Sequence, residues 1–258
     1  MDSFVATADA NQNAVDIFKG EWASALPESL NVRAGTVPLF ADARIQWLNQ
    51  RLPVAGLTVL ELGPLEGGHT WQLEQLGAAS ILALEANTRA FLKCLIVKEL
   101  LDLKRARFRC VDFMAYLEGS PEPVDLCLAS GVLYHLRRPV AFLERVSRVA
   151  GSLFLWTHYY DEAVIRGNRQ IAFRFAPGVR AEQSGFAHTL YRRNYGAGLF
   201  ARRSFGGGES FSSWLSRDDI LGALRHFGLT EIEVNFEQPD HPHGPCFALL
   251  AQRRAAPS

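Results

Sequence analysis

The sequence predicts an α/β protein built on a doubly wound, mostly parallel seven-stranded sheet with an antiparallel last strand. Short apolar segments alternate with amphipathic ones between residues 57 and 157, which is typical of a parallel sheet covered by helices on both faces. The first apolar segment runs into a glycine-broken turn. The last two apolar segments are joined by a connection too short for a crossover helix, so we expect them to pair antiparallel.

The elements are expected in the following order. After an opening segment of about 35 residues, apolar side chains at helical spacing predict a helix over 39–52. Runs such as VDLCLA and SLFLW fit strands buried on both faces. We expect strands and helices to alternate at 58–62, 69–77, 80–85, 88–102, 106–111, 113–118, 124–129, 139–149 and 152–157.

From His158 to Glu209 the chain is rich in glycine, arginine and aromatic residues and has no sustained period. We interpret this segment as a lid inserted after the fifth strand. A helix follows over 216–227, with Ser216 at its cap, and closing strands are expected at 231–237 and 246–252.

This pattern predicts three parts. Residues 1–55 form an N-terminal segment with a helix, residues 56–157 and 210–258 form the ligand-binding domain, and residues 158–209 form the substrate lid.

Composition is that of one globular enzyme. The chain has 258 residues, 48% of them hydrophobic, and its 27 basic and 27 acidic residues cancel. A zero net charge gives no overall reason to expect nucleic acid or a membrane as partner. The N-terminus lacks a basic region followed by an apolar run, so we expect a cytoplasmic protein. Four scattered cysteines without a C-x-x-C pair predict buried, reduced thiols and no metal, and the oligomeric state stays open.

The segment from Leu57 to Thr70, LTVLELGPLEGGHT, reads as a strand, a tight loop and a helix N-terminus. This arrangement presents backbone N–H groups to an anionic group. The next strand ends on Glu85, 22 residues after Gly63, where a ribose diol needs a carboxylate acceptor. Leu65 stands where a dinucleotide fingerprint has its second glycine, which disfavours a pyrophosphate. The sequence therefore predicts a nucleoside site.

The spacing Glu61-x-Gly63-x-x-x-Gly67 resembles the first motif of the class I, Rossmann-like methyltransferases that use S-adenosylmethionine (SAM). The resemblance implies SAM as cofactor and methyl transfer as the activity. Glu61, Gly63 and Gly67 match the loop on the methionine side, and Glu85 matches the ribose acceptor. Singly, these residues have structural alternatives, because glycines also serve tight turns and a carboxylate also caps a helix.

The resemblance covers most of residues 57–157 and 210–252. In the family, further contacts to the adenine and the methionine moiety come from the ends of the third and fourth strands. The matching positions here are Asp112, Phe113, Ser130 and Gly131. Asp112 is equally suited to capping the helix that follows it. Pro64 and Leu65 depart from the commonest form of the loop.

Methyl transfer from a sulfonium mainly requires alignment and exclusion of water, but a hydroxyl acceptor also needs a base. His135 and His158 each follow a predicted strand end, and we take them as the candidate catalytic residues. The alternative is that both only pack beside the cofactor. The last loop contains the residue types of a metal site, namely Asp240, His241 and His243. We do not favour this interpretation, because the loop offers no clear further ligand.

The insertion holds eight arginines and four acidic residues. A basic lid favours an acceptor with a phosphate or carboxylate, although a solvated arginine-rich surface would look the same. We therefore expect a small-molecule acceptor, anionic or sugar-bearing. The candidate substrate residues are Tyr134, Tyr159, Arg192, Tyr195 and His241.

Two other functions stay open. The run GVLYH, followed three residues later by Pro139, is similar to a segment of enzymes that modify the wobble uridine of tRNA, which implies an RNA substrate. The same cofactor motifs would also occur in a catalytically silent SAM-binding regulator.

Overall fold

The structure is a computed structural model that describes residues 4–195 and 210–254. It comprises two compact units, Met1–Val111 and Asp112–Ser258. The main sheet has seven strands in the order β3-β2-β1-β4-β5-β10-β9. Its strands are β1 (Thr58–Leu62), β2 (Ser80–Glu85), β3 (Ala106–Cys110), β4 (Val124–Ser130), β5 (Ala150–His158), β9 (Glu231–Gln238) and β10 (Cys246–Gln252).

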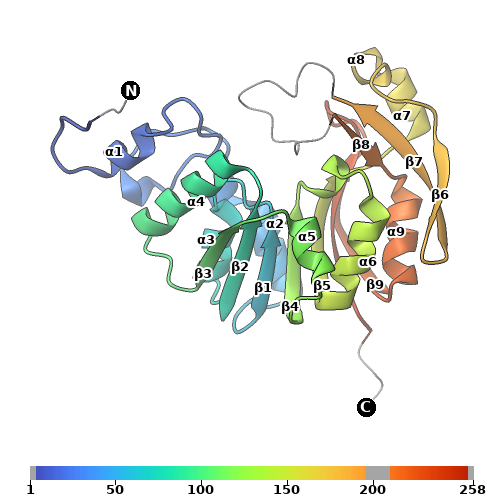
Figure 1. Cartoon of the computed structure of the whole chain (residues 1–258), viewed down its shortest axis with the longest axis horizontal. Helices are drawn as coiled ribbons and strands as arrows, with labels where there is room; N and C mark the ends of the chain where they lie inside the picture. The colour runs from blue at the N-terminus through green and yellow to red at the C-terminus, as the bar shows by residue number, and fades with distance from the viewer. Residues whose placement is uncertain (1–3, 196–209, 255–258) are drawn as a thin grey trace. The chain divides into compact units, whose positions relative to one another are not determined.

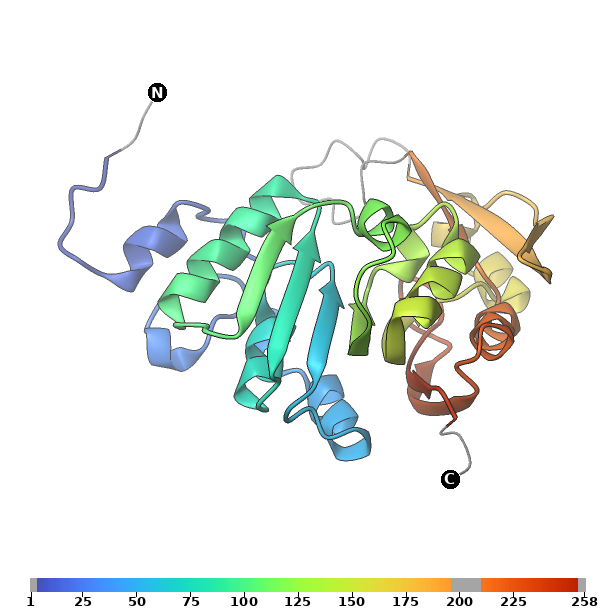
Figure 2. The same ribbon diagram turned by 60° about the horizontal axis from the view of Figure 1, so that its bottom comes forward.

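Strand direction confirms the predicted fold class. The pairs β1–β2, β2–β3 and β4–β5 are parallel, whereas β10 runs antiparallel to both β5 and β9. Figure 2 shows the three strands of the first unit side by side with their arrowheads at one edge. The segments that follow β1, β2 and β3 therefore all begin at that edge.

In the first unit, the sheet is accompanied by α2 (Ala43–Arg51), α3 (Gly68–Gln75) and α4 (Thr88–Leu100). The predicted helix over 39–52 is confirmed from residue 43, and residues 39–41 form a 3-10 turn before it. The helix starts there because the Asp42 side chain accepts the Arg44 backbone N–H at 2.9 Å, as an N-cap does.

The N-terminal segment contains α1 (Asn11–Asp16) and packs on α4 through an apolar cluster of Val15, Phe18, Trp22, Phe40 and Val97. A buried ion pair adds a second attachment. Glu66, in the loop after β1, accepts the backbone N–H of Ser24 at 2.7 Å and pairs with the ammonium of Lys93 on α4. The loop is thus tied both to α4 and to the N-terminal segment.

In the second unit, α5 (Phe113–Glu118) and α6 (Pro139–Val149) lie at the predicted positions, and α6 packs against α9 (Arg217–His226). The predicted cap of α9 is confirmed, because the Ser216 hydroxyl accepts the backbone N–H of Asp219 at 3.0 Å.

The insertion is more regular than its sequence indicated. It contains α7 (Glu162–Gly167), α8 (Arg169–Ala172), β6 (Val179–Gln183) and β7 (Phe186–Asn194). With β8 (Phe211–Trp214), the two strands form a second, antiparallel sheet. The β6–β7 hairpin runs beside α9 (Figure 1).

Two further expectations can be checked. Cys94, Cys127 and Cys246 are buried free thiols as predicted, but Cys110 is exposed at the end of β3, so its predicted burial is wrong. Within the described residues, no helix has both the length and the apolar character needed to cross a membrane.

Candidate active site

The loop between β1 and α3 folds through three residues with left-handed backbone, Gly63 (φ 66°), Leu65 (φ 58°) and Gly67 (φ 78°). Glycine adopts this conformation without strain. Gly68 follows under a different constraint, since a Cβ there would lie 2.7 Å from the carbonyl oxygen of Leu39. The left-handed backbone therefore favours glycine at positions 63 and 67, and the close approach of Leu39 requires it at position 68.

Leu65 is the residue that departs from the usual motif, and its left-handed backbone costs about 1 kcal/mol. Glu85, at the end of β2, stabilises this conformation: its Oε2 accepts the Leu65 backbone N–H at 3.1 Å. Its other oxygen, Oε1, accepts the backbone N–H of Asn87 at 2.8 Å. Burial raises the pKa of Glu85, and these backbone hydrogen bonds oppose that shift. The predicted ribose acceptor thus also holds the loop.

Glu61 is fully buried at 0% exposure in β1. Its Oε2 accepts a hydrogen bond from the Thr70 hydroxyl, whereas Oε1 has no partner among the described residues. Burial raises the pKa of this carboxyl. An unpartnered buried oxygen is uncommon in folded proteins and calls for an explanation.

The remaining predicted cofactor residues belong to the second unit. Asp112 caps α5, and its Oδ1 accepts the backbone N–H of Met114 at 2.7 Å, so the capping alternative is realised. Phe113 packs edge to face on Phe142, with ring centroids 5.8 Å apart. Their predicted contacts to adenine are not tested by this geometry.

Ser130 ends β4, and Gly131 follows with φ at 89°. The Gly131 N–H donates to the carbonyl oxygen of Trp156 at 2.9 Å. A Cβ on Gly131 would lie 3.4 Å from the Trp156 ring. The turn after β4 therefore packs directly against β5.

The two candidate catalytic histidines meet at one side chain. The ring centroid of Tyr134 lies 4.1 Å from that of His135 and 4.8 Å from that of His158. His241, from the β9–β10 connection, lies 5.0 Å from His158. The Trp214 ring stacks on His158 at 5.3 Å. The second unit thus brings together five of the predicted residues, namely Tyr134, His135, His158, His241 and, through its hydrogen bond to His135, Tyr195.

His135 and His158 are both neutral at physiological pH. Burial, with the nearby Arg193 charge, lowers the pKa of His135 to about 3. Burial also lowers the pKa of His158 to about 4, although a backbone hydrogen bond from its ring opposes the shift. Because neutral His158 donates its Nδ1–H to the carbonyl oxygen of Gly244 at 2.8 Å, its Nε2 carries the lone pair.

The hydrogen bond of His135 is compatible with either tautomer. Its Nδ1 lies 2.8 Å from the Tyr195 hydroxyl, and a hydroxyl can both donate and accept. His158 is therefore the histidine whose tautomer is fixed by its hydrogen bond, and we assign its Nε2 as an acceptor.

Two predicted substrate residues lie outside this cluster. Tyr159 is buried and donates its hydroxyl to Glu237 Oε1 at 2.7 Å. Arg192 is exposed, with its guanidinium over the Phe211 ring at 4.0 Å. Arg193, which the sequence analysis did not select, lies on the opposite face of β7 from Arg192, on the same side as Tyr195. Strand alternation would have found it, since residues 191, 193 and 195 share one face.

One group of side chains has the composition of a metal site. Ligand atoms of His158, His241 and Cys246 all lie within 4.8 Å of one another, a different set from the one that the sequence raised. The charge of Arg193 acts on His158, and it would repel a dication held there. We assign no metal to this group.

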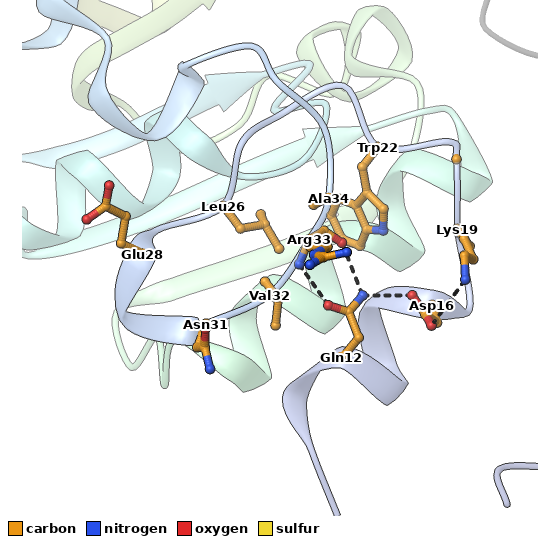
Figure 3. Close-up of a pocket in the computed structure, with 11 residues that line it drawn as sticks. Gln12, Asp16, Lys19, Trp22, Leu26, Glu28, Asn31, Val32, Arg33 and Ala34 are labelled. Carbon is orange, nitrogen blue, oxygen red and sulfur yellow. Dashed lines mark hydrogen bonds and ion pairs between the residues drawn. The ribbon is translucent and has the colours of Figure 1, made fainter. Parts of the chain in front are cut away.

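A pocket of about 900 Å³ opens elsewhere, within residues 12–34 of the N-terminal segment. Figure 3 shows its polar side chains bonded to neighbours: the Gln12 amide reaches Asp16 at 2.7 Å and the Arg33 carbonyl oxygen at 3.1 Å. None of the predicted site residues lines it.

Solved structures share this architecture. The N-terminal domain of EvdMO1, crystallised in the presence of S-adenosylhomocysteine (SAH) and D-fucose, aligns over 94% of this chain and 95% of its own. Its TM-score is 0.74 at 23% identity. The chain has the fold of SAM-dependent methyltransferases. The magnesium protoporphyrin IX methyltransferase of Synechocystis PCC 6803 with bound SAH aligns at a TM-score of 0.55 and 17% identity, over 83% of this chain and 81% of that one.

A third methyltransferase structure, the 1,6-didemethyltoxoflavin-N1-methyltransferase of Burkholderia thailandensis with SAH, has a TM-score of 0.54 at 14% identity and covers 84% of this chain and 79% of its own. The predicted fold is confirmed, and the SAH in these methyltransferase-fold structures agrees with the predicted cofactor.

Sequence comparison gives a narrower likeness. The tRNA U34 carboxymethyltransferase of Idiomarina loihiensis is 30% identical in an alignment 143 residues long, which covers 48% of this chain and 43% of that relative. The match thus spans less than half of the relative's length. No protein-family model matches the chain.

Replacing Glu61 by Gln is expected to stabilise the protein by about 1–3 kcal/mol near pH 8, because it removes an unpaired buried charge. Folding raises the pKa of Glu61, so its contribution to stability is present at low pH and is lost as the pH rises through the folded-state pKa. The gain should therefore shrink on acidification. Urea unfolding of the wild-type protein and the Glu61→Gln variant, at pH 8 and at lower pH, measures this difference in stability.

Glu66→Gln is the matched control, because Glu66 is equally buried but paired with Lys93. It is expected to destabilise by about 3–5 kcal/mol, since it leaves the ammonium unpaired. A Glu61 variant that destabilises as Glu66→Gln does would mean that Glu61 has a partner.

Proposed function

We propose that this protein is a SAM-dependent methyltransferase that acts on a small-molecule acceptor, anionic or sugar-bearing. The observation that carries the proposal is the glycine loop after β1 held by the buried carboxylate at the end of β2, Glu85. This loop belongs to a fold that the chain shares with the SAH-bound structures.

The residues of the first unit fit this cofactor. A carboxylate accepts about four hydrogen bonds, and Glu85 uses two for backbone N–H groups. It can therefore accept ribose hydroxyls without releasing the loop. Glu61 is enclosed in β1, and when it is ionised its negative charge favours the cationic sulfonium and ammonium of SAM. In the second unit, Asp112, Phe113, Ser130 and Gly131 remain the proposed cofactor residues.

Bound SAM supplies a methyl group already activated on a sulfonium, so the chain has to align the acceptor and exclude water. The neutral His158 offers its Nε2 lone pair to the proton of an acceptor hydroxyl. His135 offers its Nε2 to a polar group of the acceptor. Tyr134 packs against both rings and fixes their orientation.

Glu85→Ala is expected to weaken SAM binding by about tenfold or more, because it removes charge-assisted hydrogen bonds to the ribose. Isothermal titration with SAM and with SAH measures the change. Glu85→Gln should give a smaller loss, since one acceptor oxygen remains.

Glu99→Ala provides the control for charge alone, because Glu99 is exposed on α4. Unchanged affinity in both Glu85 variants would remove the ribose assignment. Equal losses in the Glu85 and Glu99 variants would reduce the effect to net charge.

The acceptor class can be tested by SAH formation with neutral sugars, sugar phosphates, uronic acids and unmodified tRNA. We expect turnover with small sugars or acids, and none with tRNA. The likeness to the tRNA carboxymethyltransferase makes a tRNA-modifying enzyme the second candidate function, for which the opposite result is expected. Turnover with tRNA, together with strongly salt-dependent binding, would establish that function instead. SAM binding with no turnover of any acceptor would favour a silent regulator.

With an acceptor in hand, His158→Ala is expected to lower kcat by about 100-fold or more, as loss of a general base does. His135→Ala should mainly raise KM, because it removes a hydrogen bond that positions the acceptor. His243→Ala serves as control, since this histidine is exposed in the same connection as His241. An unchanged kcat for His158→Ala would leave alignment alone as the catalytic contribution.

A further inference from the structure

Arg193 is a largely buried cation on β7. Its Nε is enclosed and donates to no acceptor, and no carboxylate pairs with its guanidinium among the residues that the structure describes. Buried charges in folded proteins are normally paired, because an unpaired one carries the full desolvation cost. A guanidinium retained in such a place calls for a partner beyond the described residues.

Among the residues that the structure describes, those around Arg193 offer hydrogen-bond donors and aromatic rings but no carboxylate. The guanidinium carbon lies 5.1 Å from the Trp214 ring centroid and 5.5 Å from that of Tyr195. The Trp214 indole N–H is a second buried donor without an acceptor. Arg174 adds a further positive charge nearby. Unused donors and unbalanced positive charge both call for an anionic ligand.

Arg193 is also connected to the candidate catalytic residues. Its guanidinium lies over the Tyr195 ring, and the Tyr195 hydroxyl hydrogen-bonds to His135 at 2.8 Å. Its charge acts on His158 as well. An anion held by Arg193 would therefore be part of a molecule whose other atoms reach these two histidines.

We propose that Arg193 binds an anionic oxygen group of the acceptor, a carboxylate or a phosphate. Three observations carry this assignment: the guanidinium has no carboxylate partner among the described residues, its Nε–H is unused, and it lies over the ring of Tyr195. It rests on the proposed function, because it names the acceptor class of that site. A guanidinium matches the oxygens of either group with parallel hydrogen bonds.

The neighbouring Arg192 supplies the contrast. It lies on the same strand with the same formal charge, but it is exposed and its Nε donates to Asn194 Oδ1 at 3.1 Å. Any general attraction of anions to this basic region acts on both residues, whereas a built site acts on Arg193 alone.

The test is a titration of the full-length protein followed through arginine Nε–H resonances by nuclear magnetic resonance. Inorganic phosphate and acetate are the two probes, one for each source of the anionic group. We expect the Arg193 signal to shift with saturation for at least one probe, while the Arg192 signal stays nearly constant. The probe that saturates identifies the group.

Variants give a second readout. Arg193→Gln is expected to weaken anion binding by about tenfold or more, Arg193→Lys by less, and Arg192→Gln to have little effect. An Arg193 signal that does not move with either probe, or that moves in parallel with Arg192, overturns the proposal. Because this result comes from the unmodified protein, it holds even where Arg193→Gln fails to fold.

The outcome is separable from that of the proposed function. SAM titration of the same samples reports on the cofactor site independently of Arg193. Normal SAM binding without a saturable anion response defeats the anion site and leaves the methyltransferase proposal standing. A saturable anion response in a protein that does not bind SAM supports the anion site and defeats the methyltransferase proposal.

Discussion

The first unit depends on how three buried carboxylates are satisfied around one loop. Glu66 pairs with the Lys93 ammonium and with the backbone N–H groups of residues 23 and 24, so its charge is fully compensated. Glu85 accepts only backbone N–H groups, and Glu61 accepts only one hydroxyl. The negative charge left uncompensated therefore increases from Glu66 to Glu61.

Local rules were sufficient for most of the main sheet. The bounds of β1, β2, α5 and α6 coincide with those predicted, because apolar runs and capping side chains act within a few residues of the chain. The path of the loop could not be predicted, because Leu65 is held by Glu85, 20 residues further on. The Glu66–Lys93 pair is likewise a long-range contact that no local pattern encodes.

The insertion shows where sequence reasoning failed and where it stopped too early. Its strands β6 and β7 were missed because few of their side chains are buried, so neither has the apolar run of a core strand. The sheet that they form with β8 is nevertheless regular. At Tyr191, Arg193 and Tyr195 the alternation was readable, and it separates these residues from Arg192. The His158–Gly244 hydrogen bond, which sets the tautomer, required the fold because 86 residues separate its partners.

The two histidines and Arg193 form a coupled system. Burial and the guanidinium charge both disfavour protonation of His135 and His158, so in the free protein neither ring is a strong base. An anionic group bound at Arg193 would compensate that positive charge and make proton uptake by His158 less costly. An acceptor with such a group would raise the basicity of His158 when its own hydroxyl must lose a proton. A neutral acceptor would leave the guanidinium uncompensated, so one local charge would provide both selection of the acceptor and activation of its hydroxyl.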